Sequence, residues 1–196
     1  MKKLVFITAL LLITANVFAQ KEVSAAEIVS LVNHGKPLVY ENVIINGEID
    51  LSNSSGSTIT GKYPENGKTV YVLSNFVKQP VTFKHCTFRG DITFCRKDES
   101  ANSKKEYRVE FTKDVIFHDC VFEKKVDFEL TNFDKGISFA GSTFKEQPRF
   151  VRMGINQKPD LQGLVLHKGC LFQFDQSKKA QNFNAVELIK AVDAFN

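Results

Sequence analysis

Phenylalanine recurs through the middle of the chain at alternating steps of five and six residues. The rhythm is unbroken from Phe117 to Phe150 and places a phenylalanine at positions 117, 122, 128, 133, 139, 144 and 150. Two steps make an 11-residue unit, such as Val-Ile-Phe-His-Asp-Cys-Val-Phe-Glu-Lys-Lys. A short fixed period of this kind predicts an array whose units bury their apolar faces against one another.

A second inward position lies two residues before each phenylalanine. This spacing of two within a five-residue segment predicts a very short strand followed by a corner. The residues at this position alternate between two kinds. The aliphatic kind is Val81, Ile92, Val115, Val126 and Ile137, and the small kind is Cys86, Cys120, Thr131 and Ser142. Four such strands close one turn of 22 residues, so we predict an all-β solenoid.

The register of this solenoid is predicted by the charged residues. Phe94 and Phe111 are 17 positions apart. If 12 of the residues between them are an insertion in the repeat, the remaining step is an ordinary one of five. Coil neighbours are then 34 positions apart across the insertion and 22 apart after it. This shift stacks opposite charges, namely Arg89 over Glu123 over Lys145, with Lys124 near Glu146, Asp91 near Lys125 and Asp127 near Arg149. Inward, it stacks Cys86, Cys120 and Ser142, and also Phe88, Phe122 and Phe144.

The first 19 residues are expected to be a signal peptide. Lys2 and Lys3 precede the apolar run Leu4–Val17, and Ala19 suits a cleavage site before Gln20. The segment is too short and poorly flanked for a permanent membrane span. We therefore expect a secreted or periplasmic bacterial protein with no membrane span in its mature chain.

The remaining chain divides into a solenoid and two flanking helices. Residues 20–36 are expected to form an N-terminal capping helix, since Ser24 and Glu27 make a capping box. Residues 37–175 are expected to form the β-helix, with loop insertions at about 52–68 and 96–107. The first insertion is either a loop excursion or a hairpin, and the second is expected to project into solvent. Residues 176–196 are expected to form a C-terminal helix. Phe76 is assigned to the array, and Gly154–Gln162 to an irregular stretch.

The charge balance argues against nucleic acid as a partner. The chain has 26 basic and 22 acidic residues. Two of the basic residues, Lys2 and Lys3, lie in the signal peptide, which leaves 24 and a net charge of +2. Such a near balance predicts neither a nucleic-acid binder nor an acidic mimic of nucleic acid.

Several segments resemble the phenylalanine-centred variety of pentapeptide-repeat protein, a secreted one with an 11-residue double repeat. They are Cys-Thr-Phe-Arg-Gly-Asp-Ile-Thr-Phe at 86–94, Cys-Val-Phe-Glu-Lys-Lys-Val-Asp-Phe at 120–128, and the entry segment 45–52. The resemblance is clearest over 81–150 and implies a right-handed quadrilateral β-helix. The chain departs from the family pattern in its six-residue steps, its few Asp or Asn residues before the central position and its two insertions. The family's better-known cytoplasmic members mimic DNA and bind topoisomerase, a role that export and a basic balance disfavour here.

No catalytic, cofactor or metal site is expected from the spacing of the polar residues. The four cysteines follow no zinc pattern, and no two histidines stand at ligand spacing. His85 and Asp119 stack outward in the predicted register. They suit an acid/base dyad in principle, but no nucleophile accompanies them, so an ion pair or a solvated histidine is favoured. His34 and His167 have no evident partner.

The cysteines are expected to be structural. Cys86 and Cys120 point inward among phenylalanines, which raises a thiol pKa and blocks access. They form either a packed thiol ladder or, as an alternative, a disulfide. Cys170 is expected to be buried in the same way. Cys95 is expected to point outward and to be the more reactive thiol.

Two functional classes remain open. The first is a non-enzymatic scaffold of the cell envelope whose two insertions touch an unidentified protein partner. The second is a carbohydrate-binding or carbohydrate-active β-helix, which requires exposed aromatic side chains together with an acidic pair or a calcium-binding Asp cluster. The alternating charges favour the scaffold, and the sequence leaves the oligomeric state open.

Overall fold

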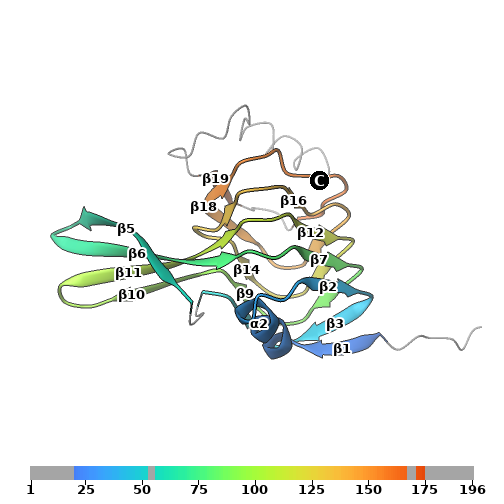
Figure 1. The fold of residues 1–196 in the computed structure, drawn as a ribbon. Helices are drawn as coiled ribbons and strands as arrows, with labels where there is room; N and C mark the ends of the chain where they lie inside the picture. The colour runs from blue at the N-terminus through green and yellow to red at the C-terminus, as the bar shows by residue number, and fades with distance from the viewer. Residues whose placement is uncertain (1–19, 53–55, 167–170, 175–196) are drawn as a thin grey trace, which may run out of the picture.

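The chain folds into a stack of short parallel strands, seen in a computed structural model that describes residues 20–52, 56–166 and 171–174. Figure 1 shows the coils stacked one on another, with two hairpins that leave the stack on one side. The expected signal peptide (1–19) and C-terminal helix (176–196) lie outside the described residues.

Successive coils contribute their strands to shared sheets. The first sheet contains β1 (Lys21–Ser24), β3 (Val43–Asn46), β8 (Thr87–Phe88), β13 (Val121–Phe122) and β17 (Thr143–Phe144). The second contains β2 (Leu38–Glu41), β7 (Val81–Lys84), β12 (Val115–His118) and β16 (Ile137–Ser138).

The third sheet is larger because it covers two strand positions of each coil and includes the hairpins. One part contains β4 (Ile49–Asp50), β9 (Ile92–Thr93), β14 (Val126–Asp127), β18 (Arg149–Ile155) and β19 (Leu171–Phe174). The other contains β15 (Asn132–Phe133), β11 (Ser103–Phe111), β10 (Cys95–Glu99), β6 (Lys68–Val77) and β5 (Thr58–Glu65). A coil such as β12 to β15 thus has four strands.

The strand register is the one that the sequence predicts. Phe122 pairs with Phe88, 34 positions before it, and with Phe144, 22 positions after it. Across the first insertion, Ile45 pairs with Phe88 at a shift of 43 positions. This shift exceeds a 22-residue coil by 21, so the first insertion is longer than the expected 52–68.

The core consists of columns of stacked phenylalanine rings. In the central column the ring centres of Phe122 lie 4.9 Å from Phe88 and 4.3 Å from Phe144, with planes nearly parallel. Phe128 stacks in the same way between Phe94 and Phe150, at 5.0 Å from each. Because neighbouring columns meet edge to face, each ring touches aromatic partners both along and across the stack.

The predicted charge ladders are mostly present on the outer surface. Ion pairs join Lys145 to Glu123 at 2.7 Å, Lys124 to Glu146 at 3.6 Å, and Arg149 to Asp127 at 3.1 Å. Two pairings differ from the prediction. Arg89 pairs with Glu22 at 3.5 Å, and the Asp91 carboxylate accepts a hydrogen bond from the backbone N–H of Lys125.

A helix, α2 (Ala25–Asn33), precedes the first full coil and lies at that end of the stack (Figure 1). The Ser24 side chain accepts a hydrogen bond from the Glu27 N–H at 3.2 Å, as the predicted capping box requires. Ala25, Ile28 and Val32 are buried in the core. Within the described residues, no helix is both long and apolar enough to cross a membrane.

Both insertions are paired β-hairpins, which is one of the two forms expected for the first insertion. Two expectations about irregular segments are wrong. Phe76 is 38% exposed, and its neighbour Val77 fills the core position that stacks on Phe111. Gly154–Gln162 keeps the coil register, because Ile155 pairs with Phe133 and Asp160 bridges to Ser138.

Candidate functional site

Two β-hairpins form a sheet that projects from the coils and that we call the wing, residues 58–74 and 95–108 (Figure 1). Its central strands, β6 and β11, run parallel and pair from Thr69↔Ser103 to Val77↔Phe111. The outer strands, β5 and β10, pair antiparallel with β6 and β11, which gives the order β5-β6-β11-β10. Because β6 and β11 end in the coil core, the wing continues the solenoid without a linker.

One face of the wing carries a row of apolar and aromatic side chains. Ile59, Leu73 and Tyr107 occupy paired positions on three adjacent strands, and the Ile59 side chain is 63% exposed. Arg96, which pairs with Tyr107 on β10, holds its guanidinium 4.2 Å from the centre of the Tyr107 ring. Tyrosine and arginine contribute strongly to binding in protein interfaces. The row therefore has the composition of a contact surface.

The two edges of the wing are protected against further strand pairing. In β5 the pairing is interrupted by a register shift between Ile59 and Gly61, and Lys62 and Pro64 follow. In β10 the residues after Cys95 are all charged. Charge, proline and irregular pairing at an edge strand oppose addition of another strand. The face of the wing is therefore a more favourable binding surface for a partner than its edges.

A buried carboxylate ties the wing to the coils. The Glu129 side chain is 6% exposed and accepts hydrogen bonds from Lys97 at 2.6 Å, Arg149 at 2.5 Å and Arg152 at 2.7 Å. Burial alone would raise the pKa of Glu129, but the hydrogen bonds from Lys97 and Arg152 and the nearby positive charges outweigh it and lower the pKa to about 2. Lys97 belongs to the wing and the two arginines to β18, so this carboxylate joins both parts.

A second carboxylate extends the same network. Glu106 on β11 pairs with Arg108 at 2.7 Å and with Arg152 at 4.0 Å. The Tyr63 hydroxyl lies close by, and burial followed by the negative charge of Glu106 raises its pKa. Arg152 thus bridges a carboxylate of the wing and one of the coils. Sequence reasoning missed this network because it pairs residues that stand in no common period.

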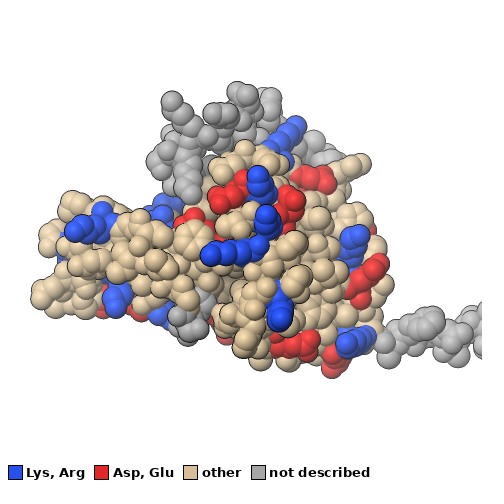
Figure 2. All heavy atoms as spheres, viewed as in Figure 1, with Lys and Arg blue, Asp and Glu red and all other residues tan. Residues whose placement is uncertain are grey.

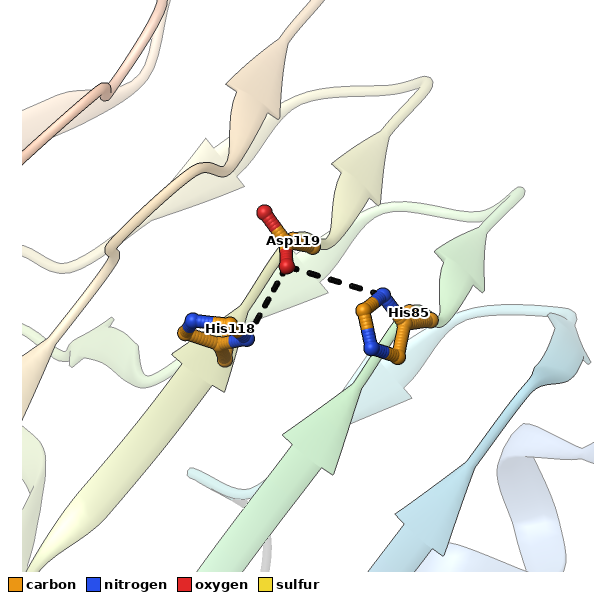
Figure 3. A group of neighbouring side chains, drawn as sticks. All are labelled: His85, His118 and Asp119. Atoms are coloured by element: carbon orange, nitrogen blue, oxygen red, sulfur yellow. Dashed lines mark ion pairs between the residues drawn. The ribbon is translucent and has the colours of Figure 1, made fainter.

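Three titratable side chains meet at one corner of the solenoid, as Figure 3 shows. His118 ends β12, Asp119 follows it, and His85 follows β7 in the coil below. The Asp119 Oδ2 atom lies 3.0 Å from His118 Nδ1 and 3.6 Å from His85 Nδ1. All three side chains are between 42% and 48% exposed. The structure thus brings together His85 and Asp119, as the predicted register requires, and adds His118, which sequence reasoning did not single out.

This corner has a left-handed backbone in successive coils. His85 and Asp119 have φ of +52° and +51°, and Asn42 and Gly141 occupy the equivalent corners with φ of +54° and +67°. Asn, Asp, His and Gly are the residue types most often found in this conformation. The backbone geometry therefore explains why a polar residue stands at the corner, independently of any function.

The two inward cysteines lie beneath the same corner. Cys86 and Cys120 are 1% and 0% exposed, and both are free thiols in this structure. The interaction between the two thiols lowers the pKa of Cys86 to about 7, whereas the same interaction and burial raise the pKa of Cys120. The expectation that burial raises both pKa values is therefore wrong for Cys86. Burial still shields both sulfur atoms from solvent.

Of the other candidate residues, Cys95 and His34 lie within the described part of the chain, and neither is placed to act as a reactive group. Burial, followed by the nearby charge of Glu129, raises the pKa of the Cys95 thiol to about 12, so the expectation of a reactive cysteine there is wrong. The His34 Nδ1 atom lies 2.7 Å from the Ser30 carbonyl oxygen within α2. Cys170 and His167 lie outside the described residues.

Comparison with known proteins agrees with the geometry of the coils. Residues 107–153 match a family model described as pentapeptide repeats (9 copies). Comparisons with curated proteins and with solved structures found no match. The matched segment runs from β11 to β18 and coincides with the part of the chain in which the 22-residue register is regular. Residues 107–153 are therefore similar to pentapeptide repeats, and the coils that contain them have the architecture of a repeat scaffold.

Proposed function

We propose that this chain is a non-enzymatic scaffold, exported to the cell envelope, that contacts a protein partner through its wing. The observation that carries the proposal is the row formed by exposed Ile59 and half-buried Leu73 and Tyr107 on a sheet that stands away from the coils. The coils position this sheet, and the wing supplies the contact surface.

The wing is held in one arrangement before any partner arrives. Its two central strands share a continuous ladder of backbone hydrogen bonds that enters the core at Val77 and Phe111. At its base, Glu129 accepts hydrogen bonds from Lys97 of the wing and Arg152 of the coils. A surface that is already ordered loses less conformational entropy on binding, and this favours affinity.

The proposal includes an architecture and a location. The four strand positions of each coil are proposed to be the four sides of a right-handed quadrilateral helix, with α2 covering its first coil. Export rests on the basic and apolar pattern of residues 1–19. Positive and negative side chains alternate over the coils on the face drawn in Figure 2, which suits a partner other than nucleic acid.

Site-specific crosslinking in the native cell tests the contact. A photoreactive amino acid at position 59 is expected to give a defined protein adduct, whereas the same group at Val39 is not. Val39 is a suitable control because it is also exposed and aliphatic but lies on β2 of the coils. Tyr107→Ala is expected to abolish the adduct at position 59. An adduct that forms equally at both positions, or that survives Tyr107→Ala, contradicts the proposal.

A carbohydrate ligand is the second candidate because one face of the wing carries two half-buried aromatic rings. Tyr71 and Tyr107 project from the same side of β6 and β11. If this face binds a polysaccharide, the protein is retained on an envelope glycan matrix and Tyr71→Ala releases it. Retention without a protein adduct at position 59 favours this alternative over the scaffold.

The export proposal has its own test. The intact mass of protein purified from its native cell is expected to correspond to a chain that begins at Gln20. Purified material that retains Met1 contradicts export through cleavage at this point.

A further inference from the structure

We propose that His85, His118 and Asp119 form a binding site for a divalent transition metal ion of the zinc type. The proposal does not depend on the wing or on the function proposed above. It rests on the geometry of three donor atoms from two adjacent coils, drawn in Figure 3.

The three donor atoms all lie within 4.8 Å of one another. Asp119 Oδ2 is 3.0 Å from His118 Nδ1 and 3.6 Å from His85 Nδ1. Zinc binds nitrogen and oxygen at about 2.0–2.2 Å, so two ligands in a tetrahedral arrangement lie about 3.3–3.5 Å apart. The two observed separations fall on either side of this range. Small rotations of the imidazole rings, whose terminal torsion is soft, bring both into it.

The backbone beneath the site is fixed by the coil. The His85 N–H donates to the His118 carbonyl at 2.9 Å, and the Asp119 N–H donates to the Ala140 carbonyl at 2.8 Å. Phe83 and Phe117 stack just before these corners, with ring centres 5.6 Å apart. Binding therefore requires adjustment of side chains only. Because these backbone hydrogen bonds hold the corners of His85 and Asp119 in place, the site is preorganised.

Gly141 leaves room for the carboxylate. A Cβ atom at this corner of the next coil would lie 1.9 Å from Asp119 Oδ1, which no side chain could tolerate without moving the carboxylate. The corner above it, Gly163, has a similar φ of +69°, yet a Cβ there meets its nearest atoms at an ordinary 3.7 Å. The glycine at 141 thus clears the space into which Asp119 points, beyond what the corner conformation itself needs.

The set of donors selects the kind of ion. Two imidazoles and one carboxylate suit zinc and other late first-row metals, whereas magnesium and calcium prefer oxygen alone. All three side chains are partly exposed, so an ion reaches them from solvent and keeps an open coordination position for water or another ligand.

Calorimetry with Zn²⁺ on the reduced, tag-free full chain tests the site. One ion is expected to bind per chain, and a large excess of Mg²⁺ is not expected to compete. Asp119→Asn and His85→Asn keep residue types suited to the left-handed corner. Each is expected to weaken Zn²⁺ binding at least about tenfold, because even indirect partners of metal ligands commonly contribute that much. His34→Gln, which removes an exposed histidine at the C-cap of α2, is the matched control and leaves the affinity unchanged.

The two glycines give a second test that does not alter any ligand. Gly141→Ala and Gly163→Ala bear similar backbone strain, but only the first displaces Asp119. Gly141→Ala is expected to weaken Zn²⁺ binding and Gly163→Ala to leave it near that of the unmodified chain. Equal affinities in these two variants, or unchanged affinity in Asp119→Asn, overturn the proposal. A Co²⁺ complex with the charge-transfer band of a thiolate ligand also overturns it, since the cysteines would then hold the ion.

Discussion

The coils and the wing are both β-sheet, but different interactions hold them. In the coils, each phenylalanine column stacks ring on ring, and Phe122 and Phe128 are completely shielded from solvent. In the wing, backbone pairing and the charges around Glu129 act together with the buried side chains of Val70 and Val72, and Ile59 is left largely exposed. Stacked aromatic rings therefore hold the coils, whereas the wing has no such column and relies more on hydrogen bonding and electrostatics.

This difference predicts that the two regions respond to different perturbations. A cavity in the coil core cannot be filled by movement of neighbours that are themselves locked in columns, so it affects the whole stack. Loss of a charge at the base of the wing affects chiefly the wing, because the phenylalanine columns do not depend on it. The following predictions test that separation, in order of expected effect.

The largest effect is expected from Phe122→Ala. This ring is stacked between Phe88 and Phe144, and its removal loses transfer free energy and leaves a cavity, at a cost of about 3–5 kcal/mol. Urea unfolding measures the loss. Phe76→Ala is the control, since that ring is 38% exposed, and it is expected to cost clearly less. Similar losses in the two variants would show that the columns are not the main source of stability.

A smaller and more local effect is expected from Glu129→Gln. The substitution keeps the shape of the side chain but removes the charge that Lys97, Arg149 and Arg152 share. Hydrogen bonds to charged groups contribute about 1.5–3 kcal/mol, and the partly exposed cations recover some hydration, so a loss of about 1–3 kcal/mol is expected in the wing. Hydrogen exchange of the β10 and β11 amides measures it. If coil amides are destabilised by the same amount, the wing is not a separate unit.

Acid is expected to weaken the wing through the same carboxylate. The pKa of Glu129 is about 2 in the folded chain against an ordinary 4.5, so between these values the unfolded chain binds a proton that the folded chain does not. The stabilisation is therefore complete above about pH 4.5 and declines as the pH falls towards 2. Three of the four tyrosines (63, 71 and 107) lie in the wing, so near-ultraviolet circular dichroism follows it. A Glu129→Gln variant that keeps the full acid response would contradict this assignment.

The smallest effect is expected from the outer charge ladder. Lys145 and Glu123 form an ion pair at 2.7 Å, but the Lys145 side chain is 54% exposed, so solvent and salt screen the attraction. Lys145→Ala is expected to change the free energy of unfolding by about 0–1 kcal/mol. A loss as large as that of Phe122→Ala would mean that surface charge, and not the core, sets the stability of the coils.

The coils could be predicted from the sequence because one residue type, phenylalanine, marks each core-facing position. Phe117, Phe122 and Phe128 face the core at each step, and Glu123 with Lys145 set the vertical register. The sequence indicated where in the chain the wing is inserted, but not how its strands pair. Residues such as Lys97 and Glu106 face charged partners instead of an apolar core, so they leave no hydrophobic period.

The candidate metal site was only half predicted, for a related reason. His85 and Asp119 were placed together by the 34-residue shift, but His118 precedes the corner and pairs with Lys84 in the ladder. Its side chain meets the others because the left-handed corner turns the Asp119 carboxylate back towards it. No spacing along the sequence encodes that turn, because it depends on backbone conformation.

Native-state hydrogen exchange, followed residue by residue with increasing denaturant, tests the central claim most directly. Amides of the middle coil, such as those of Val121 and Phe122, are expected to exchange only through global unfolding. Amides of the wing that bond within β5–β6 and β10–β11 are expected to exchange through a local opening of clearly lower free energy, with little dependence on denaturant. If wing and coil amides instead share one opening free energy and one denaturant dependence, the two regions form a single cooperative unit and the account is contradicted.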